Sequence, residues 1–140
     1  MEYQGRESFT VLEIIITVVI VAIISAVALP VYTGIKERSL AKEAKMNLRL
    51  IATAQKVYRM DWGAYFVFTG NETSAASINR DLKTSITEDN WDYAIVSDNS
   101  SFTIYADRTG SGGYKDCIYT LTHNDADGEP DPSGGVGTCP

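Results

Sequence analysis

The chain is poor in the residues on which most enzymes and metal centres depend. Its 140 residues include one histidine, His123, and two cysteines, Cys117 and Cys139. The cysteines lie too far apart for a CxxC redox or haem motif. No nucleophile triad, phosphate-binding loop or metalloprotease motif is present in the sequence. Hydrolase, redox-enzyme and haem-carrier functions are therefore poor interpretations, and we expect no catalytic activity.

Charge is missing from one long stretch of the chain. Residues 14–35 include no Asp, Glu, Lys or Arg. A helix of about 20 apolar residues crosses the hydrocarbon core of a bilayer, which is about 30 Å thick. A buried core helix is the alternative, but a chain this short cannot cover such a segment on every side. Residues 9–35 are therefore predicted to form a hydrophobic transmembrane helix.

The remaining charge is unevenly distributed. Residues 36–59 carry seven basic and two acidic side chains, whereas residues 60–140 carry thirteen acidic and four basic ones. A basic helix joined to an acidic head could form ion pairs between neighbouring copies in an assembly. Alternatively, the basic segment lies near lipid phosphates and the acidic surface keeps the head soluble. A nucleic-acid partner is not inferred.

Glycine and proline are almost absent from residues 9–59, where only Pro30 and Gly34 occur. Both halves of this segment are therefore predicted to be helical, and the second half, residues 36–62, is amphipathic. At 1.5 Å per residue the helix would be on the order of 75 Å long, so half of it is expected to protrude from the head. The apolar stripe that should pack on a small sheet consists of Leu40, Ala44, Leu48, Ile51 and Tyr58.

The rest of the chain, residues 63–140, is predicted to be a globular head. Gly63 ends the helical pattern, and a connecting segment with a short helix over residues 74–82 follows. Turn-forming residues then separate three strand-like runs, which indicates an antiparallel meander. The fold class is therefore α+β, with a long helix on a small antiparallel sheet. The predicted strands are residues 91–96, 102–106 and 117–122.

The two cysteines both lie in the last 24 residues. An even pair beyond a membrane segment, near a loop-rich terminus, suggests a disulfide in an oxidising compartment. A bridge between Cys117 and Cys139 would enclose the C-terminal loop and stabilise the fold by roughly 3 kcal/mol. Two unpaired thiols are the alternative.

Acidic residues alternate along the C-terminal tail at Asp125, Asp127, Glu129 and Asp131. Alternating carboxylates beside a glycine are similar to the first half of a calcium-binding loop. Ca²⁺ is the one cofactor that the sequence suggests. The alternative is a solvated, Asp-rich turn.

The N-terminal residues Ser8-Phe9-Thr10-Val11-Leu12-Glu13, followed by an apolar run to Pro30, resemble the N-terminus of type IV pilins and type II secretion pseudopilins. In that family a prepilin peptidase cuts before an aromatic residue, which is then N-methylated. The resemblance implies a leader of residues 1–8 and cleavage between Ser8 and Phe9, although Ser8 stands where the family usually has glycine. It also implies assembly roles for Phe9, Glu13 and Pro30, and a helix that is partly melted over residues 22–30 in the filament.

The physical chemistry of Glu13 agrees with that resemblance. A carboxylate at the edge of an apolar span is costly and should have a partner. The N-terminal amine of a neighbouring copy offers a positive charge at the same depth, and pairing would fix the axial stagger of parallel helices. The alternative is a glutamate that only snorkels to the membrane interface.

The resemblance implies a major pilin-like structural subunit of an extracellular type IV pilus that serves adhesion, motility or surface contact. Its partners would be copies of itself, prepilin peptidase and the pilus assembly machinery. The precursor would be stored in the inner membrane and the filament would lie at the cell surface. One alternative is a calcium-binding major pseudopilin of a type II secretion system. Another is a single-pass membrane protein with a ligand-binding head.

Overall fold

The computed structural model describes residues 9–68, 74–109, 114, 117–125, 128–132 and 139–140, and leaves out the side chains of residues 29 and 30. The order of elements is α1 (Val11–Trp62), α2 (Ala75–Leu82), β1 (Trp91–Ser97), β2 (Phe102–Arg108) and β3 (Ile118–Thr122). This is the predicted α+β arrangement. The chain divides into two compact units, one up to Lys36 and the other from Glu37 to Pro140, which we call the head. Each unit is described by itself.

Helix α1 is closed by local signals at both of its ends. The hydroxyl of Thr10 accepts a hydrogen bond from the backbone N–H of Glu13 at 3.2 Å, as an N-cap does. At the other end Gly63 has a φ of +78°, and its N–H donates to the Arg59 carbonyl at 2.8 Å. Glycine adopts this left-handed conformation without strain. The helix therefore begins two residues after Phe9 and ends directly before Gly63.

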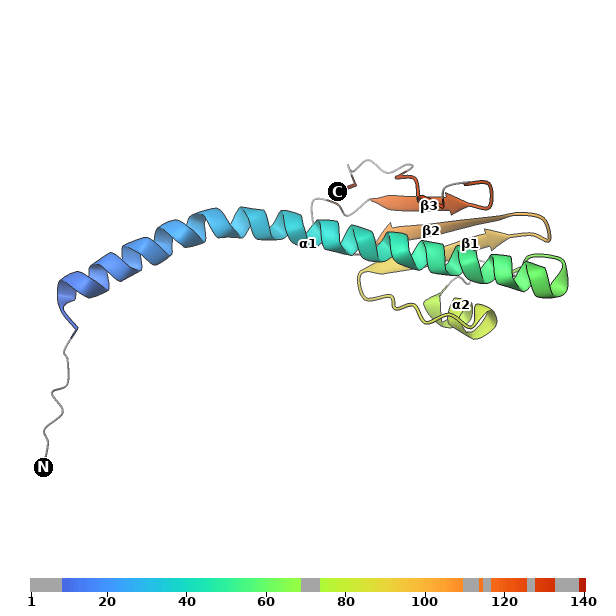
Figure 1. Ribbon diagram of the computed structural model, residues 1–140, viewed down its shortest axis with the longest axis horizontal. Helices are drawn as coiled ribbons and strands as arrows, with labels where there is room; N and C mark the ends of the chain where they lie inside the picture. The colour runs from blue at the N-terminus through green and yellow to red at the C-terminus, as the bar shows by residue number, and fades with distance from the viewer. Residues whose placement is uncertain (1–8, 69–73, 110–113, 115–116, 126–127, 133–138) are drawn as a thin grey trace, which may run out of the picture. The chain divides into compact units, whose positions relative to one another are not determined.

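The three strands form one antiparallel sheet in the order β1-β2-β3 (Figure 1). The register pairs Ile95 with Ile104, and Ile104 with Leu121. Side chains alternate along each strand, so one face carries the apolar set. The predicted meander is confirmed, with β1 and β2 slightly longer than expected and β3 beginning at Ile118. The buried residues on this face are Trp91, Tyr93, Ile95, Phe102, Ile104, Ala106, Tyr119 and Leu121.

The head packs the second half of α1 against that apolar face (Figure 1). Three members of the predicted stripe, Ala44, Leu48 and Ile51, are fully buried, whereas Leu40 and Tyr58 are half-buried. The sequence pattern missed one buried polar position on the same helix, Gln55. Burial of this amphipathic stripe stabilises the helix far more than its intrinsic propensity does.

Helix α2 lies in the connection between α1 and the sheet. Its N-cap is Ser74, whose hydroxyl accepts a hydrogen bond from the backbone N–H of Ser77 at 3.4 Å. Ala75, Ile78 and Leu82 are its buried residues, spaced by three and four as on one helical face. The predicted short helix over residues 74–82 therefore begins one residue later, at Ala75.

The turn between β1 and β2 is organised by Asp98. Its carboxylate accepts hydrogen bonds from the backbone N–H groups of Ser100 and Ser101 at 2.7 and 2.6 Å. The hydroxyls of the same two serines also donate to it. These bonds favour the ionised form, so the pKa of Asp98 is held well below its usual range. The sequence Asp98-Asn99, predicted as a separator of strands, therefore forms a self-stabilised turn.

Candidate assembly surface

The N-terminal part of α1 exposes an apolar surface. The large apolar side chains described between Phe9 and Ile35 are 49–78% exposed. By length and composition this helix can cross a membrane, and none of its most apolar stretch is buried within the structure. Exposed apolar surface of this extent is stable only against lipid or against another protein surface.

Two threonine hydroxyls near this apolar surface are satisfied within the helix. The hydroxyl of Thr17 donates to the carbonyl of Ile14 at 2.8 Å, and Thr10 caps the first turn. Glu13 lies in that first turn, where a carboxylate interacts favourably with the helix dipole. Among the described residues, none forms a hydrogen bond or an ion pair with the exposed Glu13 carboxylate. Glu13 is the only charged side chain in residues 9–35 of the sequence, so its carboxylate is the charge on this surface that a partner would have to satisfy.

Of the other residues predicted for the N-terminal site, the structure describes Phe9 and the backbone of Pro30 but not Ser8. Phe9 is 76% exposed and lies one helical turn before Glu13 in the sequence. Pro30 lies inside α1, which continues through it in the single chain. The melting predicted for residues 22–30 concerns the filament and stays a prediction. Ser8 lies outside the described residues, and so does the predicted leader.

In the head, part of the basic face of α1 is neutralised by the chain's own tail. The Arg49 guanidinium binds the Glu129 carboxylate and also donates to the Gly128 carbonyl at 2.9 Å. Lys45 lies 3.7 Å from the same carboxylate. Two of the seven basic residues that suggested ion pairs between copies are thus engaged within one chain. The attraction between the basic helix and the acidic head acts at least partly inside the subunit.

A second ion pair joins α1 to β2, between the first residue of the head, Glu37, and the last residue of β2, Arg108. Glu37 and Arg108 approach to 3.4 Å, and Arg108 also donates to the carbonyls of Asn90 and Thr109 at 2.7 and 2.9 Å. Its guanidinium lies 5.7 Å from the centre of the Trp91 ring. The side chains of Glu37 and Arg108 are mostly buried, so this pair is less screened by solvent than the pairs of the tail.

The buried amide of Gln55 fixes the chain after α1. Its Nε2 donates to the carbonyl of Phe66 at 3.1 Å, and its Oε1 accepts from the N–H of Phe66 at 2.9 Å. The amide therefore satisfies both backbone groups of one residue, as a neighbouring β-strand would. The polarity of a glutamine at a position that continues the apolar stripe was the available signal for this role.

Burial also changes the acidity of two tyrosines on the apolar face of the sheet. Burial raises the pKa of Tyr93 to about 12. The hydrogen bond that Asn47 donates to the Tyr93 hydroxyl at 2.8 Å offsets part of this rise. Burial raises the pKa of Tyr119 as well. Both phenols therefore stay neutral, and they act as core residues with polar tips.

The tail is joined to the sheet by the predicted disulfide. Cys117 and Cys139 are bonded, with their Cα atoms 5.2 Å apart, within the range that disulfides require. The tail is also paired with β3, because Thr120 and Asp131 exchange backbone hydrogen bonds of 2.9 and 2.8 Å.

The predicted calcium ligands are only partly described. Asp125 accepts a hydrogen bond from the N–H of Thr122 at 2.5 Å, and Glu129 is bound by Arg49. Asp131 is exposed, and Asp127 lies outside the described residues. Within the described part of the chain, no three His, Cys, Asp or Glu side chains are grouped as a metal site would require. The calcium prediction therefore stays untested.

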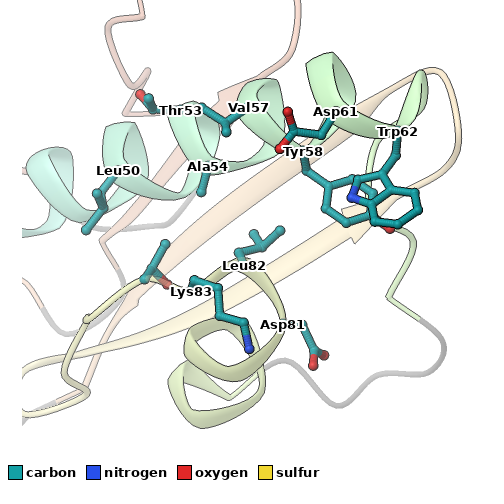
Figure 2. Close-up of a pocket in the computed structure, with 11 residues that line it drawn as sticks. Leu50, Thr53, Ala54, Val57, Tyr58, Asp61, Trp62, Asp81, Leu82 and Lys83 are labelled. Atoms are coloured by element: carbon teal, nitrogen blue, oxygen red, sulfur yellow. The ribbon is translucent and has the colours of Figure 1, made fainter.

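A groove of about 460 Å³ lies between α1 and the end of α2 (Figure 2). Leu50, Ala54 and Val57 line it from α1, and Leu82 lines it from α2. Tyr58 and Trp62 stack with ring centres 6.1 Å apart at one end of it. Asp81 lies at its rim, and the Arg80 guanidinium that hydrogen-bonds to it holds its pKa below the usual value. The described part of the head thus carries an apolar hollow on its surface, lined from α1 and α2.

The chain is similar to the type IV major pilin protein PilA of Myxococcus xanthus (strain DK1622), with 38% identity over 63 residues. The matched stretch is 45% of this chain and 29% of that pilin, so it spans less than a third of the relative. No protein-family model matches the chain. No solved structure matches it either. The long apolar N-terminal helix and the small antiparallel sheet fit a pilin-like fold.

Proposed function

We propose that the chain is a structural subunit of a type IV pilus-like filament, held together by packing of the N-terminal helices. The observation that carries this proposal is the exposed apolar part of α1 with Glu13 in its first turn, a carboxylate that has no partner in the described part of the chain. Uniform apolar helices slide past one another with little change in buried area, and lipid competes for the same surface. One carboxylate at a fixed depth supplies the stagger that apolar contact lacks. The similarity to a type IV major pilin supports the same role.

In this proposal, prepilin peptidase removes residues 1–8 and leaves Phe9 as the N-methylated first residue. The new amine of one copy pairs with Glu13 of its neighbour. The precursor is stored in the inner membrane through the apolar segment, and the assembled filament lies outside the cell. Adhesion, motility and surface contact are the roles that such a filament would serve.

The experiment that tests this proposal compares Glu13→Ala with the unmodified chain in cells. Fibres are sheared from the cells, and the subunit in the sheared fraction is compared with the total by immunoblot. We expect an unchanged total and at least a tenfold loss of fibres, because a charge-assisted hydrogen bond of about 1.5–3 kcal/mol disappears from every subunit contact. The intact mass of unmodified fibres should correspond to a chain that starts at methylated Phe9.

A matched control keeps that experiment specific. Asp92→Ala removes an exposed carboxylate from β1 of the head and should leave the fibre yield unchanged. Glu13→Gln retains the size of the side chain without its charge and should behave like Glu13→Ala. A normal fibre yield for both Glu13 variants would show that this residue only snorkels to the interface. Complete absence of fibres from unmodified cells would favour the single-pass membrane protein.

The second candidate function is a calcium-binding pseudopilin, which the alternating acids of the tail favour. Calcium held by Asp125, Asp127, Glu129 and Asp131 would compete with Arg49 for Glu129. Calcium that binds only the folded state stabilises it by mass action, by about 2.7 kcal/mol when the free calcium concentration is 100 times the Kd. The melting temperature rises with this gain in stability. We therefore expect millimolar calcium to raise the melting temperature relative to excess chelator, as measured by circular dichroism. Identical melting curves would leave the tail as a solvated turn.

A further inference from the structure

The groove of Figure 2 is an apolar surface of the head to which the proposed function assigns no role. Leu50, Ala54 and Val57 line it along α1. Leu50 is 43% exposed and Val57 is 50% exposed, so both side chains are open to solvent in the single chain. A groove with an apolar lining along a helix suits the apolar face of another helix.

One carboxylate of this groove is unpaired. Asp61 lines the groove from α1, is exposed, and forms no hydrogen bond or ion pair with any residue that the structure describes. On the opposite wall, the Asp81 carboxylate accepts hydrogen bonds of 2.7 and 3.0 Å from the Arg80 guanidinium (Figure 2). Lys83 on that wall also attracts Asp81. A partner of this groove should therefore be apolar and should carry one cation at the Asp61 end.

Another stretch of α1 has this combination of side chains. Val31 and Ile35, at the end of the uncharged segment, are 56% and 61% exposed. Arg38 follows them, is exposed, and has no hydrogen-bond or ion-pair partner among the described residues. Seven residues separate Val31 from Arg38, and the same number separates Ala54 from Asp61. Two parallel helices in this register would bring the apolar side chains together and the two opposite charges together.

A single chain cannot place these two stretches side by side, because both belong to the same continuous helix. The segment that fills the groove must therefore come from a second copy. Contact between two different surfaces of identical chains is heterologous, and it can repeat from copy to copy into an open filament. This is the kind of interface that a polymer requires.

We propose that the groove of one subunit binds residues 31–38 of a second copy, with Arg38 of that copy paired to Asp61. The two copies are then offset by 23 residues, or about 35 Å along parallel helices. Gly34 of the second copy lies opposite Val57 in this register, and it has no side chain to hold the helices apart.

This inference rests on the proposed filament and adds a second contact to it. Pairing of Glu13 with the amine of Phe9 offsets two copies by only four residues. The groove therefore contacts a more distant copy along the filament. The first contact sets the stagger of the apolar helices, and the second joins the head of one subunit to the helix of another.

The test exchanges the two charges in cells and measures the subunit in the sheared fraction relative to the total. Asp61→Arg and Arg38→Asp each place like charges at the contact and should lower the fibre yield roughly fivefold or more. The double variant R38D/D61R restores opposite charges and should return the yield to within about twofold of the unmodified chain. The control R38D/D92R moves the new cation to an exposed position on β1 and should stay as poor as Arg38→Asp.

Photo-crosslinking identifies the occupant directly. Benzoylphenylalanine replaces Val57 in the groove and, as a control, Val96, which is 65% exposed on β1. After irradiation of fibres, we expect the Val57 position to crosslink to a peptide that contains residues 31–38, and the Val96 position not to do so. Crosslinks from Val57 only to lipid, to a small molecule or to peptides of another head would overturn the proposal.

The charge exchange can also refute this contact. Normal fibre yield from both single variants, or no recovery in R38D/D61R, would overturn the proposal and leave the filament proposal standing. Equal recovery in R38D/D92R would indicate an effect of net charge rather than a contact. The melting temperature of Asp61→Arg is measured on the full chain in detergent, and a clear fall would mean that Asp61 stabilises the head instead. Absence of fibres from unmodified cells would overturn the filament proposal and this contact with it.

Discussion

The pair Leu48→Ala and Leu50→Ala tests which face of α1 stabilises the head. The two leucines are two residues apart on one helix, yet Leu48 is 0% exposed and Leu50 is 43% exposed. Truncation of a fully buried leucine costs about 2–5 kcal/mol, from lost transfer energy and from the cavity that remains. Leu50 lines the open groove of Figure 2, so its truncation leaves no enclosed cavity. We expect that change to cost about 1 kcal/mol or less.

The difference is large enough to measure by thermal unfolding. For a domain of roughly 100 residues, 1 kcal/mol shifts the melting temperature by about 4 °C. Leu48→Ala should therefore lower the melting temperature by roughly 8–20 °C, and Leu50→Ala by about 4 °C at most. Near-ultraviolet circular dichroism of the full chain in detergent follows the buried rings of Trp91, Tyr93 and Tyr119. Equal losses for the two variants, or a larger loss for Leu50→Ala, would refute the assignment of the buried face.

Two further predictions concern the stability of the head. Replacing both Cys117 and Cys139 by serine removes a crosslink between residues 22 apart in the sequence. We expect the free energy of unfolding, measured by denaturant titration, to fall by about 3 kcal/mol. An unchanged denaturation midpoint would contradict this prediction. The pKa of Tyr93 is raised to about 12 in the folded state. As the pH rises, the unfolded chain therefore loses the phenolic proton of this residue before the folded chain does. The free energy of unfolding should fall as the pH rises from about 10 to 12. In Tyr93→Phe this fall should be smaller, as thermal melts across that pH range would show, and an identical pH profile would contradict the assignment.

Most of the fold could be predicted from the sequence because its signals are local. Each signal acts within a few residues. These signals are the helical period of the apolar stripe of α1, the alternation of side chains along the strands, the helix end at Gly63 and the turn at Asp98. The N-terminal site, which rests on Phe9 and Glu13 four residues apart in the sequence, stays a prediction. The two cysteines were paired correctly because only one pairing is possible.

The interactions that the sequence did not reveal join residues far apart in the chain. Arg49 and Glu129 are 80 residues apart, and Glu37 and Arg108 are 71 apart. Composition showed a basic helix and an acidic head, but it could not distinguish pairs within one subunit from pairs between subunits. Only the arrangement in space decides this, because each basic side chain has many acidic candidates.

The bonds made by Gln55 have a consequence for how this protein can diverge among related species. Both of its hydrogen bonds go to backbone atoms of Phe66, so the course of the chain after α1 does not depend on which side chains that segment presents to solvent. Exposed positions such as Val67 can therefore be exchanged freely under selection, while the Gln55 amide, together with the Ser97 hydroxyl that donates to the Phe66 carbonyl at 2.8 Å, keeps the main chain on the same course. We expect Gln55 to be retained in relatives whose outer surface has drifted beyond easy alignment.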